Sequence, residues 1–179
     1  MRIAKIFLFF ILLGSLIPEF LKAQGIFSDS SSITNNGYRL IIKLNSRQLV
    51  LYQGDREVKT YPIAVPRKRI RPIIGGGYVE SIILNPWWYP TEATRQDFLK
   101  EKGVRLPKAI SPNHPLNAMG KVKICLSYTF NGKRLYRIHG TNDPTKIGQA
   151  VSRGCFRMRN EDILELVKFL KGGTPVIIN

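Results

Sequence analysis

The sequence predicts a β-rich mixed α+β domain that has one principal helix near its C-terminus and one or two short helices. Two observations lead to this class. Several runs of β-branched and aromatic residues are separated by short turn signals, which is typical of consecutive strands. One late segment has apolar residues at helical spacing. The chain has 179 residues, of which 44% are hydrophobic, so one domain with a substantial core is expected.

The first half of the chain is predicted to be mostly strands. Runs at residues 38–45, 48–54 and 56–65 are separated by Asn-Ser-Arg and Gly-Asp turn signals, and another run follows at 78–84. The basic segment before this last run ends in three consecutive glycines, Gly75–Gly77. Because these glycines lack the spacing of a phosphate-binding loop, we predict a flexible loop and no nucleotide site there.

A tight hairpin is the strongest local signal. Asn131 and Gly132 form a turn pair between two strand patterns. If this pair is a two-residue loop, counting back along both strands places Ile124 opposite His139. In that register Cys125 points to the face of the sheet opposite that of His139.

Two segments carry helix signals. The segment 91–103 begins with a threonine that can cap a helix and ends in glycine, so a short surface helix is predicted. The segment 160–173 is amphipathic, and we expect Asn160 to cap it and Gly172 to end it. A last strand is expected at 174–179. The apolar side of the second helix is expected to comprise Ile163, Leu164, Leu166, Val167, Phe169 and Leu170.

Two further segments are irregular. The aromatic turn at 85–90, Asn-Pro-Trp-Trp-Tyr-Pro, either lines a groove with its rings or packs them under a loop. The segment 109–120 contains His114 and is predicted to be a loop. No His, Cys or carboxylate flanks His114 at the spacing of a metal site, so the sequence implies no metal and His114 is interpreted as a loop residue.

The N-terminus has the pattern of an export signal. A short basic start precedes an apolar run, Pro18 breaks the run, and small residues follow. We predict a signal peptide at 1–23, a Ser/Asn-rich linker at 24–37 and one folded domain at 38–179. The alternative is an uncleaved signal that attaches the protein to a membrane. Both interpretations place the domain outside the cytoplasm.

The charge balance favours a polyanionic partner. The chain has 28 Lys and Arg against 12 Asp and Glu, a formal net charge of +16. Export argues against nucleic acid and leaves an acidic cell-wall polymer as the simplest partner. The alternative is a well-solvated basic surface with no such partner.

His139 and Cys155 are the candidate catalytic pair. Sixteen positions separate them, which permits contact without enforcing it. A free thiol is mostly protonated at neutral pH, and a neighbouring imidazole can take its proton. The backbone N–H groups of Gly154 and Cys155 could face a developing oxyanion, and Arg157 adds a fixed cation. These parts suit acyl transfer through a thioester, and we expect a carbonyl in the turn 140–142 to orient His139.

A disulfide is the competing interpretation. Two cysteines in an exported protein first suggest a Cys125–Cys155 bond. The hairpin register expected above argues against it, because it turns Cys125 away from the face that carries His139.

The order of residues around the pair resembles the catalytic stretch of the L,D-transpeptidases, the YkuD-type domain. The resemblance rests on His-Gly-Thr at 139–141, then Ser-Arg-Gly-Cys-Phe-Arg at 152–157, and covers the chain from about residue 37 to its C-terminus. It implies the β-sandwich fold of that family. Residue by residue, it implies that His139 is the general base and Cys155 the nucleophile. The positions around the nucleophile that it matches as oxyanion or substrate-binding residues are Ser152, Gly154 and Arg157.

The resemblance also implies a reaction. Cys155 would attack the peptide bond after the third residue of a peptidoglycan stem tetrapeptide, and the terminal D-alanine would leave. An amine of another stem, a free D-amino acid or a protein lysine would then take the acyl group. No cofactor is implied. Arg153 stands where many members have His, which leaves the base role to His139 alone, and the segment 65–78 lacks the usual Thr-Pro-x-Gly run.

Two other functions stay open at this point. One is a different exported cysteine acyltransferase of the sortase type, which also places His before Cys and Arg after it. The other is a non-catalytic, basic cell-wall-binding module. The tight Ser-Arg-Gly-Cys-Phe-Arg spacing argues against the first, and the intact His139 and Cys155 argue against the second.

Overall fold

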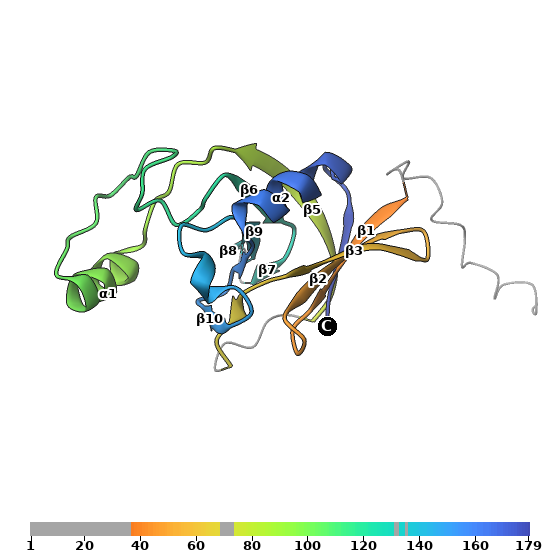
Figure 1. Cartoon of the computed structure of the whole chain (residues 1–179), viewed down its shortest axis with the longest axis horizontal. Coiled ribbons are helices and arrows are strands. Elements are labelled where there is room, and N and C mark those ends of the chain that lie inside the picture. The colour runs from red at the N-terminus through yellow and green to blue at the C-terminus, as the bar shows by residue number, and fades with distance from the viewer. Residues whose placement is uncertain (1–36, 69–73, 131–132, 135) are drawn as a thin grey trace, which may run out of the picture. The chain divides into compact units, whose positions relative to one another are not determined.

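The computed structural model describes most of the predicted domain (Figure 1). The described residues are 37–68, 74–130, 133–134 and 136–179. The predicted signal peptide, and the predicted linker except for Gly37, lie outside them. Within these ranges, none of the helices is both long enough and apolar enough to span a membrane.

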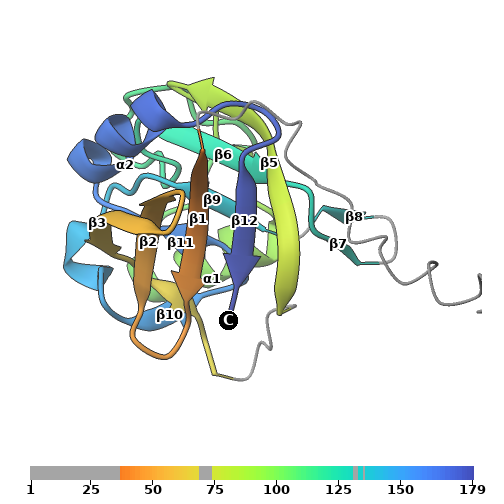
Figure 2. The same ribbon diagram turned by 90° about the vertical axis from the view of Figure 1, so that its right-hand side faces the viewer.

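Twelve strands are formed by the described residues, and eight of them build one mixed sheet. These eight are β1 (Tyr38–Lys43), β2 (Gln48–Gln53), β3 (Arg56–Pro62), β5 (Gly75–Leu84), β6 (Val122–Leu126), β9 (Arg137–His139), β11 (Phe156–Arg157) and β12 (Pro175–Ile178). Their order in the sheet is β11-β9-β6-β5-β12-β1-β2-β3. The sheet curls, so that β6, β9 and β11 run behind β1 and β12 in Figure 2. The core lies inside this curl, as in a β-sandwich.

The other four strands form two small pairs. β4 (Val65–Pro66) pairs with β10 (Ala150–Ser152), and β7 (Thr129–Phe130) pairs with β8 (Lys133–Arg134). The run predicted as one strand at 56–65 is therefore divided. Its second part turns to pair with the segment that leads to Cys155.

Alternation of side chains fixes which face of each strand is buried. On β1, Leu40 and Ile42 are fully buried, and on β12 Val176 and Ile178 are fully buried. The two strands are parallel neighbours, with Leu40 opposite Val176. The predicted strands at 38–45, 48–54 and 174–179 are confirmed, because one face of each is apolar and finds the core.

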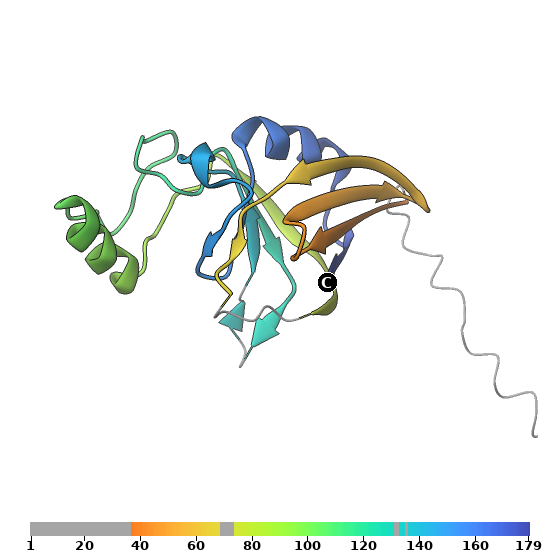
Figure 3. The same ribbon diagram turned by 60° about the horizontal axis from the view of Figure 1, so that its bottom comes forward.

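The first helix, α1 (Glu92–Lys102), has the ends that the sequence predicts. The Thr91 hydroxyl accepts a hydrogen bond from Thr94 N at 3.2 Å, and Gly103 ends the helix with φ +68°. Among its residues α1 buries none. It lies away from the sheet at the end of two long connections (Figures 1 and 3).

The second helix differs from its prediction. α2 (Asn160–Leu166) is followed by a 3-10 turn, η3 (Val167–Phe169), so it is shorter than expected. The longer helix is α1, not the C-terminal helix that the sequence predicts to be the principal one. The amide of Asn160 does not cap it but bonds the loop after β9, as described below. Leu164 was expected on the apolar side and is instead 42% exposed, whereas Ile163 and Leu166 are fully buried.

The prediction of a flexible loop at Gly75–Gly77 is wrong. These glycines form the start of β5 and pair with β12, with Gly77 opposite Val176. The reason is Tyr128, whose ring packs on the strand: a Cβ at position 77 would lie 2.6 Å from Tyr128 Cε2. The Tyr128 hydroxyl lies 2.8 Å from the carbonyl oxygens of Gly75 and Val176. Gly77 thus makes room for an aromatic ring.

The hairpin register is one residue from the prediction. Phe130 pairs with Lys133 as a two-residue loop requires, although the loop residues themselves lie outside the described part of the chain. Further along, however, Ile124 pairs with Ile138, which leaves Cys125 on the same face as His139. The shift arises because Ser127 and the following residue turn toward β5, adding one residue on that side of the hairpin.

Candidate active site

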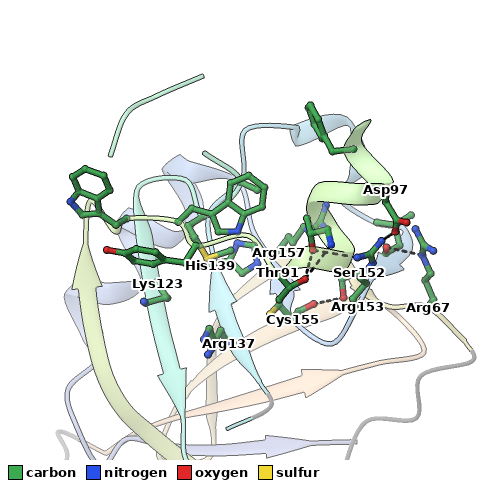
Figure 4. A pocket seen from close by; sticks show the side chains of 18 of the residues that line it. Arg67, Thr91, Asp97, Lys123, Arg137, His139, Ser152, Arg153, Cys155 and Arg157 are labelled. Atoms are coloured by element: carbon green, nitrogen blue, oxygen red, sulfur yellow. Dashed lines mark hydrogen bonds and ion pairs between the residues drawn. The ribbon is translucent and has the colours of Figure 1, made fainter. Parts of the chain in front are cut away.

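A cavity of about 530 Å³ contains both predicted catalytic residues in its wall (Figure 4). His139 comes from β9 and Cys155 from the turn before β11. The aromatic segment 87–89 and the inner side of α1 complete the wall. The cavity lies on the face of the sheet that is turned away from the core.

The pairing of β9 with β11 brings the two residues together. The strands are parallel, with Ile138 opposite Phe156 and His139 opposite Arg157. Met158 N donates to His139 O at 2.9 Å. Because Ile138 and Phe156 are fully buried in the core, the residues on either side of each, His139 and Cys155 among them, point the other way. The long sequence separation is thus closed by strand pairing.

His139 is held in one orientation by backbone groups. It is 2% exposed, and its Nδ1 lies 2.6 Å from Gly140 O, so this nitrogen carries the proton and donates it to the carbonyl. The expectation that a carbonyl in the turn 140–142 orients the ring is confirmed. Burial, and then the charge of Arg157, lowers the pKa of His139 to about 4, although backbone hydrogen bonds with Gly140 and Ala118 oppose this. The imidazole is therefore neutral at pH 7, and Nε2 is the ring nitrogen without this proton.

Cys155 is a free, half-buried thiol. Burial raises its pKa, while the charge and hydrogen bonds of Arg137 and the charge of Arg157 lower it in part. The resting pair is therefore a neutral thiol beside a neutral imidazole. Cys125 is also free. It lies two strands away from Cys155, about 10 Å between Cα atoms, which is beyond the reach of a disulfide.

The turn before Cys155 is closed by its own hydrogen bonds. Ser152 Oγ donates to Cys155 O at 2.5 Å and accepts from Gly154 N at 3.3 Å. Gly154 has φ +137°, which side chains disfavour, so glycine is required there. We expected Ser152 and the Gly154 N–H to face the substrate. Both groups are instead engaged inside the turn, where they set the position of Cys155.

Arg157 lies beside the pair, as expected. Its backbone forms two 2.9 Å hydrogen bonds with Ala64, and its side chain lines the cavity. Four further cations line the same cavity: Arg67, Lys123, Arg137 and Arg153. That Arg137 lines the cavity was not predicted from the sequence. Arg137 stands two residues before His139, so the alternation of side chains along a strand could have placed both on the same face.

Asn160 fixes the loop that follows His139. Its Oδ1 accepts from Lys121 N at 3.0 Å and from Thr141 N at 3.3 Å, and its Nδ2 donates to Thr141 O at 2.9 Å. A side chain at Gly120 or Gly140 would collide with this amide. The amide therefore holds in place the turn whose carbonyl orients His139.

Comparison with known proteins decides the family. The sequence pattern of the YkuD family, the L,D-transpeptidase catalytic domain, matches residues 37–178. The chain belongs to this family. Its predicted β-rich sandwich fold is confirmed by solved structures: it resembles an L,D-transpeptidase from Mycobacterium smegmatis with a TM-score of 0.55 at 11% identity, over 80% of this chain and 58% of that one.

Curated relatives of the family are more similar in sequence. The chain is 40% identical to the "putative L,D-transpeptidase YkuD" of Bacillus licheniformis over 141 residues, 79% of this chain and 65% of that protein. It is 37% identical to the "probable L,D-transpeptidase ErfK/SrfK" of Salmonella typhimurium, over 78% of this chain and 43% of that one. The chain thus spans less than two thirds of the length of these relatives.

Arg153, the departure from the family pattern, forms a link to α1. Its guanidinium forms an ion pair with Asp97 and donates to Thr94 Oγ1 at 3.2 Å. Figure 4 shows this contact between α1 and the turn before Cys155. This polar link attaches α1 to the turn before Cys155.

The aromatic turn lines the groove, which decides between the two interpretations of residues 85–90. Trp87 is 50% exposed and Tyr89 is 68% exposed, and both face the cavity together with Trp88. The backbone of Trp88 is held by two hydrogen bonds with Ile110, at 2.9 and 3.0 Å.

His114 lies in a loop, as predicted. Its Nδ1 accepts from Leu116 N at 3.1 Å. It lines a second cavity of about 330 Å³ rather than the one with Cys155.

Proposed function

We propose that the protein is an L,D-transpeptidase that transfers the acyl group of a peptidoglycan stem tetrapeptide through a Cys155 thioester. The observation that carries this proposal is that β9 and β11 present a neutral His139 and a free Cys155 on one face, inside a cationic groove. The family membership of the domain supports the same chemistry.

The arrangement suggests a two-step reaction. His139 Nε2 takes the thiol proton while Cys155 Sγ attacks the carbonyl carbon of the scissile peptide bond. We assign the developing oxyanion to the backbone N–H of Cys155 and to the cations of the wall. The imidazolium then protonates the departing amine, which leaves as D-alanine, and the thioester remains.

In the second step an amine attacks the thioester. His139 takes a proton from this amine, the new amide bond forms, and the proton returns to the sulfur as the thiol leaves. The acceptor is a stem amine, a free D-amino acid or a protein lysine. No cofactor enters the cycle we propose.

The charge of the domain supports an acidic partner outside the cytoplasm. The net charge is +16, and five cations line the cavity against the acidic side chains of Asp97 and Glu101. We infer that the groove binds stem peptides through their carboxylates. We also propose export through the segment 1–23, cleaved or kept as a membrane anchor, with 38–179 as the catalytic domain.

Purified disaccharide tetrapeptide is the direct test. Incubation with the protein is expected to give cross-linked dimers and free D-alanine, detected by mass spectrometry. Cys155→Ala should abolish both products, and Cys125→Ser, two strands away, should keep most of the activity. Loss of activity only in Cys125→Ser would overturn the assignment of the nucleophile.

The same material separates the alternatives. A wall-binding module would bind sacculi without forming a thioester, so no acyl-enzyme mass would appear. A sortase-type enzyme would cleave a sorting peptide and leave the tetrapeptide intact.

A further inference from the structure

We propose that Arg137 is a catalytic residue, which stabilises the negative charge on the Cys155 sulfur when His139 removes the thiol proton. The proposal rests on the proposed function only in taking Cys155 as the nucleophile.

The strand register places Arg137 beside the sulfur. On β9 it precedes His139 by two residues and so shares its face. It pairs with Cys125 of β6 on one side, and on the other side β11 begins next to it, directly after Cys155. Since Phe156 stands opposite Ile138, the preceding residues of the two segments, Cys155 and Arg137, are neighbours, and both line the cavity. The charge and hydrogen bonding of Arg137 lower the pKa of the Cys155 thiol, against the effect of burial. Figure 4 shows Arg137, His139 and Cys155 on the wall of the same cavity.

The site needs such a cation. Proton transfer from Cys155 to His139 creates a thiolate in a half-buried position, where an unpaired charge is poorly solvated. In many cysteine enzymes the resting imidazolium supplies the opposite charge. Here His139 is 2% exposed and neutral before the reaction, so it offers no charge to the resting thiol.

The other charged groups are less suited to this role. Those that line the same cavity are His139, Arg157, Lys123, Arg67, Arg153, Asp97 and Glu101. Arg153 is engaged by Asp97 and Thr94. Lys123 stands opposite His139, one strand further from Cys155. Arg157 stands opposite His139, and its charge lowers the pKa of the thiol less than that of Arg137, the strand neighbour of Cys155.

Thiol alkylation tests the proposal without any peptidoglycan substrate. Only the thiolate reacts with iodoacetamide, so the pH at which the rate reaches half its maximum reports the pKa of Cys155. All variants carry Cys125→Ser, which leaves one thiol. We expect Arg137→Gln to raise this midpoint by about 1 pH unit or more, the usual effect of losing an adjacent opposite charge. Arg137→Lys should give an intermediate value, because it keeps the charge but not the forked donors.

Lys123→Gln is the matched control, since it removes one positive charge from the same wall but one strand further from the sulfur. Its midpoint should move by less than about 0.3 units. Equal shifts in Arg137→Gln and Lys123→Gln, or no shift in either, would overturn the proposal. If Arg137→Gln does not fold, as judged by circular dichroism, Arg137→Met removes the same charge and keeps the apolar stem. A failed tetrapeptide assay would count against the proposed function and would leave this result standing.

Discussion

The stability of the domain is expected to fall in mild acid because of His139. The ring is 2% exposed, and its pKa is lowered from 6.5 to about 4 in the folded protein. In the unfolded chain it has its ordinary pKa. Between these two values the unfolded chain binds more protons than the folded one, so the free energy of unfolding decreases as the pH falls through this window.

The size of the effect follows from the shift. Well below pH 4, a pKa shift of this size lowers the free energy of unfolding by about 3 kcal/mol. At about pH 4.5, roughly 2–3 kcal/mol of this stability is already lost. Other groups also titrate there, so the wild-type loss alone does not isolate His139. The variant His139→Gln removes the ionisable ring and keeps a donor for Gly140 O.

Urea unfolding followed by far-ultraviolet circular dichroism, at about pH 7 and about pH 4.5, measures the difference. The wild type should lose roughly 2–3 kcal/mol more than His139→Gln between the two conditions. His114→Gln, in an exposed loop, should behave as the wild type. Equal losses in the wild type and His139→Gln would refute the argument, because they would mean that His139 is not held neutral by burial.

Three other changes have defined outcomes. Asn160→Ala removes three hydrogen bonds and should destabilise the domain by about 2–4 kcal/mol in urea unfolding. It should also slow acylation of Cys155 measured by mass spectrometry, and an unchanged rate would mean that the loop orients His139 unaided. Tyr128→Phe removes a buried hydroxyl that bonds two strands and should cost about 1 kcal/mol in the same unfolding assay; no cost would mean that water replaces it. Asp97→Asn breaks the ion pair that holds α1 and should speed amide hydrogen exchange in that helix, while global stability changes by less than about 0.5 kcal/mol. Unaltered exchange would show that α1 is held by other contacts.

The elements that the sequence predicts well are those whose signal is local. The strands β1 and β2 alternate apolar and polar residues because one face meets the core, and α1 carries both of its end signals within its own segment. The two candidate catalytic residues could also be predicted from the sequence, since His139 and Cys155 each stand in a short, distinctive motif. Their contact, however, depends on the pairing of β9 with β11.

The errors have long-range causes. The strand at Gly75–Gly77 is predicted as a loop because its partner strand β12 and the ring that requires glycine at position 77, that of Tyr128, both lie far along the chain. Ser127 bonds Tyr78 of β5, and the hairpin register shifts by one between this point and the turn, which puts Cys125 on the same face as His139. The role of Asn160 was misjudged for a similar reason: its partners are a loop and a turn, 19 and 39 residues away in sequence.

The position of the tryptophans has a consequence for spectroscopy. The chain has only two, Trp87 and Trp88, and both line the cavity that contains Cys155. The intrinsic indole emission of the protein therefore originates in the cavity that contains Cys155. A ligand or acyl group that enters the cavity should quench or shift this emission without any added label. Fluorescence thus reports occupancy of the groove in real time, while the unfolding of the distant core is better followed by the optical activity of the backbone.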